Sequence, residues 1–325
     1  MQKDDFYFLS SDNSTKIHAI ECQNKTSKIT RILQIIHGMT EYIDKYIPFI
    51  EYLTSFGFIV VGHDQLGHGS SFTSSENQGY FGEPDPNMNL IEDINKLRTI
   101  TQEKYKDLPY FILGHSMGSY LLWQYITIYN DNNIAGILLL GTGFVNPCVT
   151  SLGLKLISIW ACFKGWKHKS NFINNIVSGN EIKKYDTTGK DLNNSWLTRD
   201  PEMALKLIND KKSNFIFTLN GFYGLLKCVN YVCNNSNLVK IKSSLPILFL
   251  SGKGDLIGDY GKGVIKSAEI MKSIGSIDVT VKLFENDRHE LLNEIDRKDV
   301  YDYIISWIEQ KCKLYNIKNK KALIW

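Results

Sequence analysis

Short runs of almost wholly apolar residues alternate along the chain with longer segments of helical period. Apolar strands without strict alternation are typical of a mostly parallel sheet that helices cover on both faces. Three earlier runs also have strand character, and turn residues join the first two as a hairpin. The sequence therefore predicts a doubly wound α/β domain. The predicted strands are Phe6–Ser10, Lys16–Cys22, Arg31–Ile36, Phe58–Val61, Tyr110–Leu113, Ile134–Leu140, Pro246–Leu250 and Val279–Phe284.

The strand–helix alternation is interrupted once, between about Pro147 and Leu238. This stretch contains helical patterns at Leu152–Phe163 and Pro201–Ile208 but no convincing strand. We expect a helical insertion above the carboxyl edge of the sheet, which divides the chain into core residues 1–146, an insertion at 147–240 and core residues 241–325. The apolar segment Ser151–Trp166 either packs on the body of the protein, the commoner role of such a pattern, or touches lipid aggregates.

Composition narrows the class of protein. Hydrophobic residues make up 43% of the 325 residues and charged residues 22%, as in ordinary globular domains. The net charge of +3 gives no reason to expect a nucleic-acid partner. The six cysteines contain no C-x-x-C pair and are too sparse for a disulfide scaffold, which favours a reducing compartment. Neither a signal peptide nor an apolar run of membrane-spanning length is evident, so we expect a cytoplasmic protein that can associate peripherally with membranes. The oligomeric state stays open.

A serine flanked by glycines follows the predicted strand Tyr110–Leu113. The segment Gly114-His115-Ser116-Met117-Gly118 leads from this strand into a helical run, which is the context of a nucleophile elbow. So sharp a turn forces the serine into strained dihedral angles and leaves no room for side chains at the glycine positions. The helix N-terminus behind the serine favours developing negative charge. We expect Ser116 to be a nucleophile; the alternative is a turn serine that caps the helix.

A second candidate segment, His37-Gly38-Met39-Thr40-Glu41, directly follows a predicted buried strand. Acyl transfer needs two backbone N–H donors for the oxyanion. One usually comes from the residue after the nucleophile and the other from the loop after an early strand, so we expect Met117 and Met39 to supply them. Gly38 would let the backbone approach the substrate. We expect His37 to bond to the loop backbone and not to take part in catalysis.

The general base is expected near the C-terminus. Hydrolases of this architecture carry the nucleophile, the acid and the histidine in that order, and only His168 and His289 follow Ser116. His168 lies between lysines in the helical insertion. His289 follows the last predicted strand in a short polar loop, so we expect it to be the base.

The acid that orients this histidine should follow the preceding strand. Asp255 lies just beyond Pro246–Leu250 and is the expected acid, with Asp259 and Asp287 as alternatives. The chain has neither a C-x-x-C nor an H-E-x-x-H motif, so we expect no metal site.

Together these motifs resemble the monoacylglycerol lipase/lysophospholipase branch of the α/β-hydrolases, of the serine aminopeptidase S33 type. The resemblance covers roughly residues 30–310. It implies a helical cap over an acyl pocket, a Ser–Asp–His triad, no cofactor, and a structural loop at Asp64–Gly69 beneath the site. The Asn- and Lys-rich insertion departs from the family, which leaves acyl-chain length and head group open. The similar segments are His37–Glu41 with Tyr46, Val61–Ser70, Gly114–Gly118, Trp196–Pro201, Ser251–Asp255 and Arg288–Glu290.

The resemblance implies a serine carboxylester hydrolase whose partner is a small lipid ester with one acyl chain. The alternatives are a general esterase for small esters, an S33-type peptidase, and a ligand receptor built on the same fold. Tyr80 and Phe81 are candidate contacts for the substrate, and the competing interpretation is that they pack under a loop.

Overall fold

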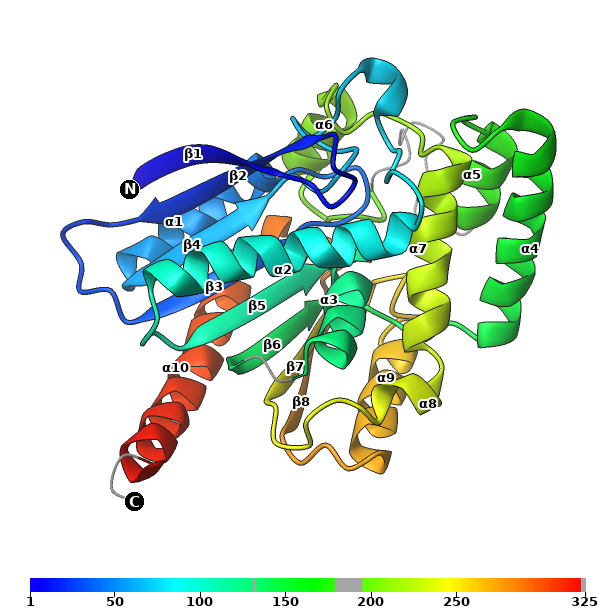
Figure 1. Ribbon diagram of the computed structural model, residues 1–325. Coiled ribbons are helices and arrows are strands. Elements are labelled where there is room, and N and C mark those ends of the chain that lie inside the picture. The colour runs from blue at the N-terminus through cyan, green and yellow to red at the C-terminus, as the bar shows by residue number, and fades with distance from the viewer. Residues whose placement is uncertain (131–132, 179–194, 323–325) are drawn as a thin grey trace.

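The computed structural model describes residues 1–130, 133–178 and 195–322, which form one eight-stranded sheet covered by helices (Figure 1). The strand order is β1-β2-β4-β3-β5-β6-β7-β8. The β1–β2 and β2–β4 pairs are antiparallel, and the pairs from β4 to β8 are parallel. The predicted fold class is confirmed, and each predicted strand is present. The strands are β1 (Gln2–Leu9), β2 (Lys16–Gln23), β3 (Arg31–Ile36), β4 (Phe58–His63), β5 (Tyr110–His115), β6 (Ile134–Leu140), β7 (Ile247–Gly252) and β8 (Val279–Phe284).

Alternate residues of the central strands pack into two separate cores, one on each face of the sheet. On β5, Phe111 and Leu113 belong to one core, and Tyr110 and Ile112 belong to the other. Helices α1 and α10 cover the first face, and α2, α3 and α9 cover the second. β8 differs from the prediction of a fully buried strand: its residues are half-buried, because it lies at the sheet edge with a neighbour on one side only. These helices are α1 (Ile47–Ser55), α2 (Pro86–Lys104), α3 (Met117–Ile128), α9 (Lys262–Ser273) and α10 (Arg297–Ala322).

Between β6 and β7, the part of the chain that the structure describes (residues 141–178 and 195–246) contains five further α-helices. Helix α7 packs against α2 and α3 of the core and also against α4, whereas α4 and α5 lie on the far side of α7 from the sheet (Figure 1). The predicted helical patterns at Leu152–Phe163 and Pro201–Ile208 fall within α4 and α6. Residues 179–194 of the predicted insertion lie outside the described residues, and the division into core and cap stays a prediction. These helices are α4 (Pro147–Lys164), α5 (Asn171–Ser178), α6 (Pro201–Asn209), α7 (Leu219–Val232) and α8 (Asn235–Leu238).

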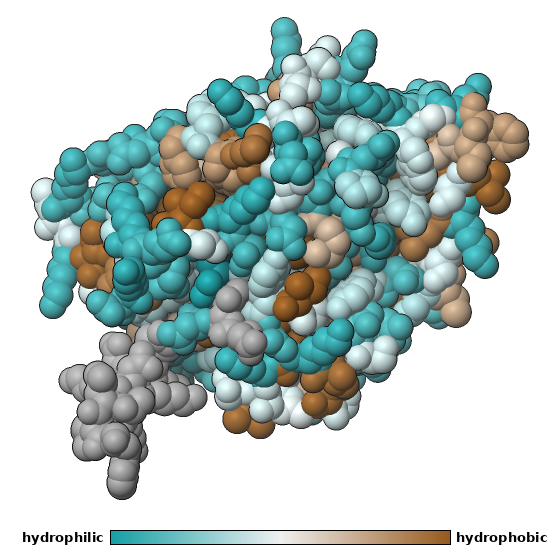
Figure 2. All heavy atoms as spheres, viewed as in Figure 1, coloured by the Kyte–Doolittle hydropathy of each residue, from teal (hydrophilic) through white to brown (hydrophobic). Residues whose placement is uncertain are grey.

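Helix α4 has one packed face and one exposed apolar face. Ile157 and Ala161 are buried, whereas Leu152 is 70% and Phe163 is 82% exposed. Hydrophobic side chains accordingly reach the surface at the end of the molecule formed by α4 and α5 (Figure 2). One face of α4 therefore packs on the body of the protein. Lipid contact through the exposed face of α4 stays a prediction. Within the described residues, no helix combines the length and the apolar character needed to cross a membrane.

Candidate active site

Ser116 occupies a sharp turn between β5 and α3. Its backbone has φ +51° and ψ −119°, a conformation that costs free energy in a residue with a side chain. The flanking glycines are required by space, because a Cβ on Gly114 would lie 2.4 Å from the carbonyl oxygen of Gly118. A Cβ on Gly118 would lie 2.1 Å from the carbonyl oxygen of Ile36. The strand–turn–helix geometry predicted for Gly114–Gly118 is thus present.

The loop after β3 reaches the same place. A Cβ on Gly38 would lie 3.1 Å from the Cβ of Ser116, so the backbone of this loop passes directly beside the serine. His37 Nδ1 donates to the Gly38 carbonyl oxygen at 2.8 Å, and His37 Nε2 accepts from the backbone N–H of Gln65 at 2.9 Å. Burial lowers the pKa of His37, so its ring is neutral and holds the loop. This geometry gives His37 the structural role that we expected.

The two residues expected to bind the oxyanion flank this junction. Met117 is the first residue of α3, where backbone N–H groups have no acceptor within the helix. Met39 follows Gly38 and packs its side chain against the core. Both therefore lie close to Ser116 in the chain or in space, and their role as oxyanion donors remains a proposal.

His289 and Asp255 form a buried pair at the carboxyl edge of the sheet. His289 Nδ1 lies 2.9 Å from Asp255 Oδ1, and both side chains are buried. Asp255 also accepts from the backbone N–H of Ile257 at 2.9 Å and from Ser251 Oγ at 3.1 Å. Burial alone would raise the pKa of Asp255, but the charge and hydrogen bond of His289 and these further donors hold it below its ordinary value. Asp255 is therefore a carboxylate that can hold one imidazole tautomer.

The two alternative acids lie elsewhere. Asp259 is exposed to solvent. Asp287 is buried, but its Oδ1 pairs with Arg199 Nη2 at 2.6 Å. Of the three candidates, Asp255 is the one hydrogen-bonded to His289.

A glycine after β6 makes room for the His289 ring next to the serine turn. Gly141 has φ +58°, and a Cβ there would lie 2.9 Å from His289 Cε1. The neighbouring Leu140 accepts a hydrogen bond from the backbone N–H of Ser116 at 2.9 Å. The rings of His289 and His115, the residue before Ser116, are 5.0 Å apart. The imidazole of His289 is thus held beside the nucleophile elbow.

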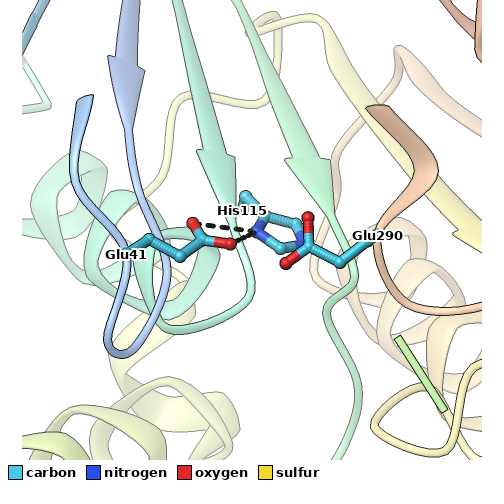
Figure 3. Close-up of side chains that lie close together, drawn as sticks. All are labelled: Glu41, His115 and Glu290. Atoms are coloured by element: carbon cyan, nitrogen blue, oxygen red, sulfur yellow. Dashed lines mark hydrogen bonds and ion pairs between the residues drawn. The ribbon is translucent and has the colours of Figure 1, made fainter. Parts of the chain in front are cut away.

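Glu41, His115 and Glu290 form a buried cluster that the sequence pattern does not predict. Figure 3 shows the two carboxylates on opposite sides of the His115 ring, each from a different loop or strand end. His115 Nδ1 donates to Glu41 at 3.1 Å, and His115 Nε2 donates to the His289 carbonyl oxygen at 3.3 Å. Because both ring nitrogens face acceptors, His115 is a cation. The cluster therefore ties the elbow to the backbone of His289.

The charged groups in this cluster shift one another's pKa values. Burial lowers the pKa of His115, but the two carboxylates outweigh it and raise the value to about 10. Burial would raise the pKa of Glu41, and the His115 charge holds it well below the ordinary value. Burial and the Glu41 charge raise the pKa of Glu290 to about 7. Glu290 is therefore the group of this cluster that titrates near neutral pH.

Replacing Glu290 by glutamine should change how stability depends on pH. Since the pKa of Glu290 is raised from 4.5 to about 7, its contribution to stability is complete below pH 4.5 and is lost as the pH rises through 7. We expect Glu290→Gln to gain roughly 1–3 kcal/mol of unfolding free energy relative to the native protein between pH 4.5 and 8. Urea unfolding at several pH values measures this difference. Glu285→Gln, at an exposed position, is the control. If the difference in unfolding free energy between variant and native protein were independent of pH for both variants, the raised pKa of Glu290 would be contradicted.

Among the residues that the structure describes, two groups of three potential metal ligands have their atoms close together, but protein donors already engage them. In the first, Glu41 Oε2 accepts from the backbone N–H of Gly38 and from Tyr46 Oη, both at 2.6 Å. In the second, Arg199 pairs with each of the three carboxylates. The protein's own donors and charges account for both. The members of the two groups are Glu41, His115 and Glu290, and Asp287, Glu294 and Asp296.

The loop at Asp64–Gly69 supports the site from below. Asp64 accepts from the backbone N–H groups of Ile43 and Ser70, both at 2.8 Å, and pairs with His18 Nδ1 at 3.0 Å. His68 Nδ1 donates to the Leu66 carbonyl oxygen at 3.2 Å. These contacts match the structural role that the resemblance implied.

The two candidate substrate contacts have packing partners. Phe81 is fully buried, with its ring 5.0 Å from that of Phe217. Tyr80 donates from its hydroxyl to Glu83 at 3.1 Å, and Lys167 lies over its ring. These contacts support the packing interpretation, and a role in substrate binding stays a prediction.

A mostly parallel eight-stranded sheet with a serine elbow after β5 and a histidine–carboxylate pair after β7 and β8 defines an α/β-hydrolase. The chain belongs to the family described as serine aminopeptidase, S33, whose model matches residues 27–296. It is therefore a hydrolase of that family.

Named relatives are similar at low identity over most of this chain. A monoglyceride lipase homolog of Monkeypox virus is 24% identical, over 86% of this chain and 89% of that protein. An uncharacterized abhydrolase domain-containing protein of Dictyostelium discoideum is 23% identical over 96% of this chain, which spans only 29% of that longer protein. Among solved structures, a thermostable carboxyl esterase from Bacillus coagulans in complex with glycerol has a TM-score of 0.87 and 28% identity, covering 96% of this chain and 99% of that one.

Proposed function

We propose that this protein is a serine carboxylester hydrolase that cleaves monoacyl lipid esters, such as monoacylglycerols or lysophospholipids. The observation that carries the proposal is the convergence of Ser116 at the elbow with the buried His289–Asp255 pair beside it. The 2.9 Å hydrogen bond to Asp255 occupies Nδ1 of the imidazole and leaves Nε2 as the nitrogen for proton transfer. His115, the other described histidine at the elbow, leaves no nitrogen for proton transfer. Both of its ring nitrogens face acceptors.

The proposed reaction has two steps. Ser116 Oγ attacks the ester carbonyl carbon while His289 Nε2 takes its proton, and the backbone N–H groups of Met39 and Met117 bind the oxyanion. The C–O bond to the alcohol then breaks, and His289 returns the proton to the leaving alkoxide. Water attacks the acyl-enzyme by the same route and releases the fatty acid and Ser116. Every proton in this cycle moves through His289, and no cofactor is needed.

The preference for one acyl chain is supported by the relatives. The viral relative is named a monoglyceride lipase homolog, and the Bacillus coagulans esterase binds glycerol, the head group of such an ester. Two alternatives also have support. The family description names an aminopeptidase, and the esterase is named for carboxyl esters in general. The substrate series below separates these three activities.

Catalytic efficiency should rise with acyl-chain length. Each buried methylene contributes about 0.8 kcal/mol, so kcat/KM should rise several-fold for every two carbons until the pocket is filled. Triacylglycerols should be poorer substrates, because a site for one chain has no place for the others. The measurement is kcat/KM for monoacylglycerols from two to eighteen carbons, beside a triacylglycerol and an amino-acid arylamide.

Each alternative predicts a different result in this series. A profile that peaks at acetate would replace the lipid proposal with a general esterase. Cleavage of the arylamide without dependence on chain length would identify a peptidase. Saturable binding of the esters with negligible turnover, together with no labelling of Ser116 by a fluorophosphonate, would indicate a receptor and contradict the enzyme proposal.

A further inference from the structure

The segment Ser195–Asp200, which we call the strap, precedes α6 and lies against the loop that carries His289. The backbone N–H of Glu290 donates to the Leu197 carbonyl oxygen at 2.7 Å. Thr198 Oγ1 donates to the Asn293 carbonyl oxygen at 3.0 Å. Hydrogen bonds of the strap thus reach the residue directly after His289 and continue beyond it.

Arg199 fixes the strap to both ends of the histidine loop. Its Nη2 pairs with Asp287 at 2.6 Å and with Asp296 at 2.6 Å, and its Nε pairs with Glu294 at 3.2 Å. Glu294 is fully buried and also accepts from the backbone N–H groups of Arg199 at 3.1 Å and Arg288 at 2.7 Å. Since one guanidinium contacts all three clustered carboxylates, it ties the strap to the loop.

The strap places an aromatic ring on the proposed general base. The rings of Trp196 and His289 are stacked, with centroids 5.1 Å apart and planes 27° from parallel. The side chain of His289 is only 3% exposed. Asp255 holds Nδ1 of the same imidazole, and His115 approaches it with a ring distance of 5.0 Å. Trp196 is therefore a direct neighbour of the imidazole, and it comes from a part of the chain that the proposed mechanism does not use.

We propose that Trp196 is a positioning residue, which the strap presses against His289 to fix the imidazole plane and to stabilise the imidazolium that forms during acyl transfer. This inference rests on the proposed function, in which His289 is the general base. An indole face attracts a cation more strongly than a neutral ring. In the proposed cycle His289 becomes an imidazolium when it takes the serine proton, so the interaction with the indole strengthens on the way to the transition state. Such an interaction raises kcat and leaves KM nearly unchanged.

Three substitutions distinguish an effect of the aromatic face of Trp196 from an effect of its side-chain volume alone. Trp196→Phe keeps an aromatic face, Trp196→Leu keeps apolar bulk without one, and Trp160→Ala removes another stacked tryptophan, on Phe172 in the α4–α5 region. With 4-nitrophenyl butyrate as the probe, we expect Trp196→Leu to lower kcat about 3- to 30-fold, with KM within about twofold of the native value. Trp196→Phe should restore most of kcat, and Trp160→Ala should leave it unchanged. Equal kcat values for the Phe and Leu variants would overturn the proposal, because packing alone would then explain the residue.

A second comparison separates this inference from the proposed function. His289→Ala should lower kcat by several orders of magnitude to a small residual rate, and adding Trp196→Leu should not lower that residual rate further, because the tryptophan acts through the histidine. Full activity of His289→Ala would defeat the proposed function itself. Loss of activity in His289→Ala with native kcat in Trp196→Leu would defeat the positioning role alone.

Discussion

Replacing Ser116 by alanine is expected to lower kcat for ester hydrolysis by about a millionfold, as removal of an activated nucleophile does in serine hydrolases. The loss should not come from unfolding, because alanine differs from serine by a single oxygen and the φ of +51° is equally strained for both. Steady-state kinetics with a short 4-nitrophenyl ester measures the effect. Labelling by a fluorophosphonate probe, read by mass spectrometry, should disappear in the same variant.

Ser273→Ala is a suitable control for this experiment, because Ser273 is an exposed serine in α9 that only caps a local carbonyl oxygen. Its kcat and its labelling should match those of the native protein. Hydrolysis at a near-native rate by Ser116→Ala would remove this serine from the mechanism.

Asp255→Asn should lower kcat by about 10⁴-fold. An asparagine keeps the size of the side chain but can present an N–H group to His289 Nδ1, which then must accept, so the imidazole adopts the tautomer that cannot take the serine proton. The 2.9 Å contact makes this exchange direct. The effect should fall on kcat more than on KM, since Asp255 is buried and holds the histidine, not the substrate.

The matched variant is Asp259→Asn, four residues further along the same loop region. Asp259 is exposed, so its replacement should change kcat by less than about threefold. If Asp259→Asn were the severe variant and Asp255→Asn the mild one, the acid would be misassigned.

Most of the sheet could be predicted because its central strands are short runs with both faces buried. Such runs stand out in a sequence, as Tyr110–Leu113 and Ile134–Leu140 do. β8 was correctly located, but its half-exposed character was not foreseen, because the position of a strand within a sheet is decided by pairing between distant segments. Antiparallel pairing of β2 with β4 is likewise a tertiary fact that the sequence pattern does not carry.

The candidate site divides in the same way. Ser116 and His289 could be singled out because local motifs and chain order mark them, and Asp255 because it follows a recognisable strand. The structure pairs His289 with Asp255, and the catalytic roles of the three residues stay a prediction. The pairing of Glu41 with His115 was missed, although both stand in motifs that were singled out, because residues 41, 115 and 290 meet only in the folded chain. Trp196 was noted as part of a family-like segment, but nothing in its neighbours along the chain points to an imidazole.

The strap also limits how this protein can be re-engineered. An insertion between two strands invites exchange as a cassette, in which the helices from one hydrolase are transplanted to give another its substrate range. Here the last residues before α6 are bonded into the loop of the proposed base. A chimera whose downstream junction falls after Asp200 would import a foreign strap against a native histidine loop. Productive exchanges should therefore end before Ser195, so that the donor supplies α4 and α5 and the recipient keeps its own strap together with α6, α7 and α8.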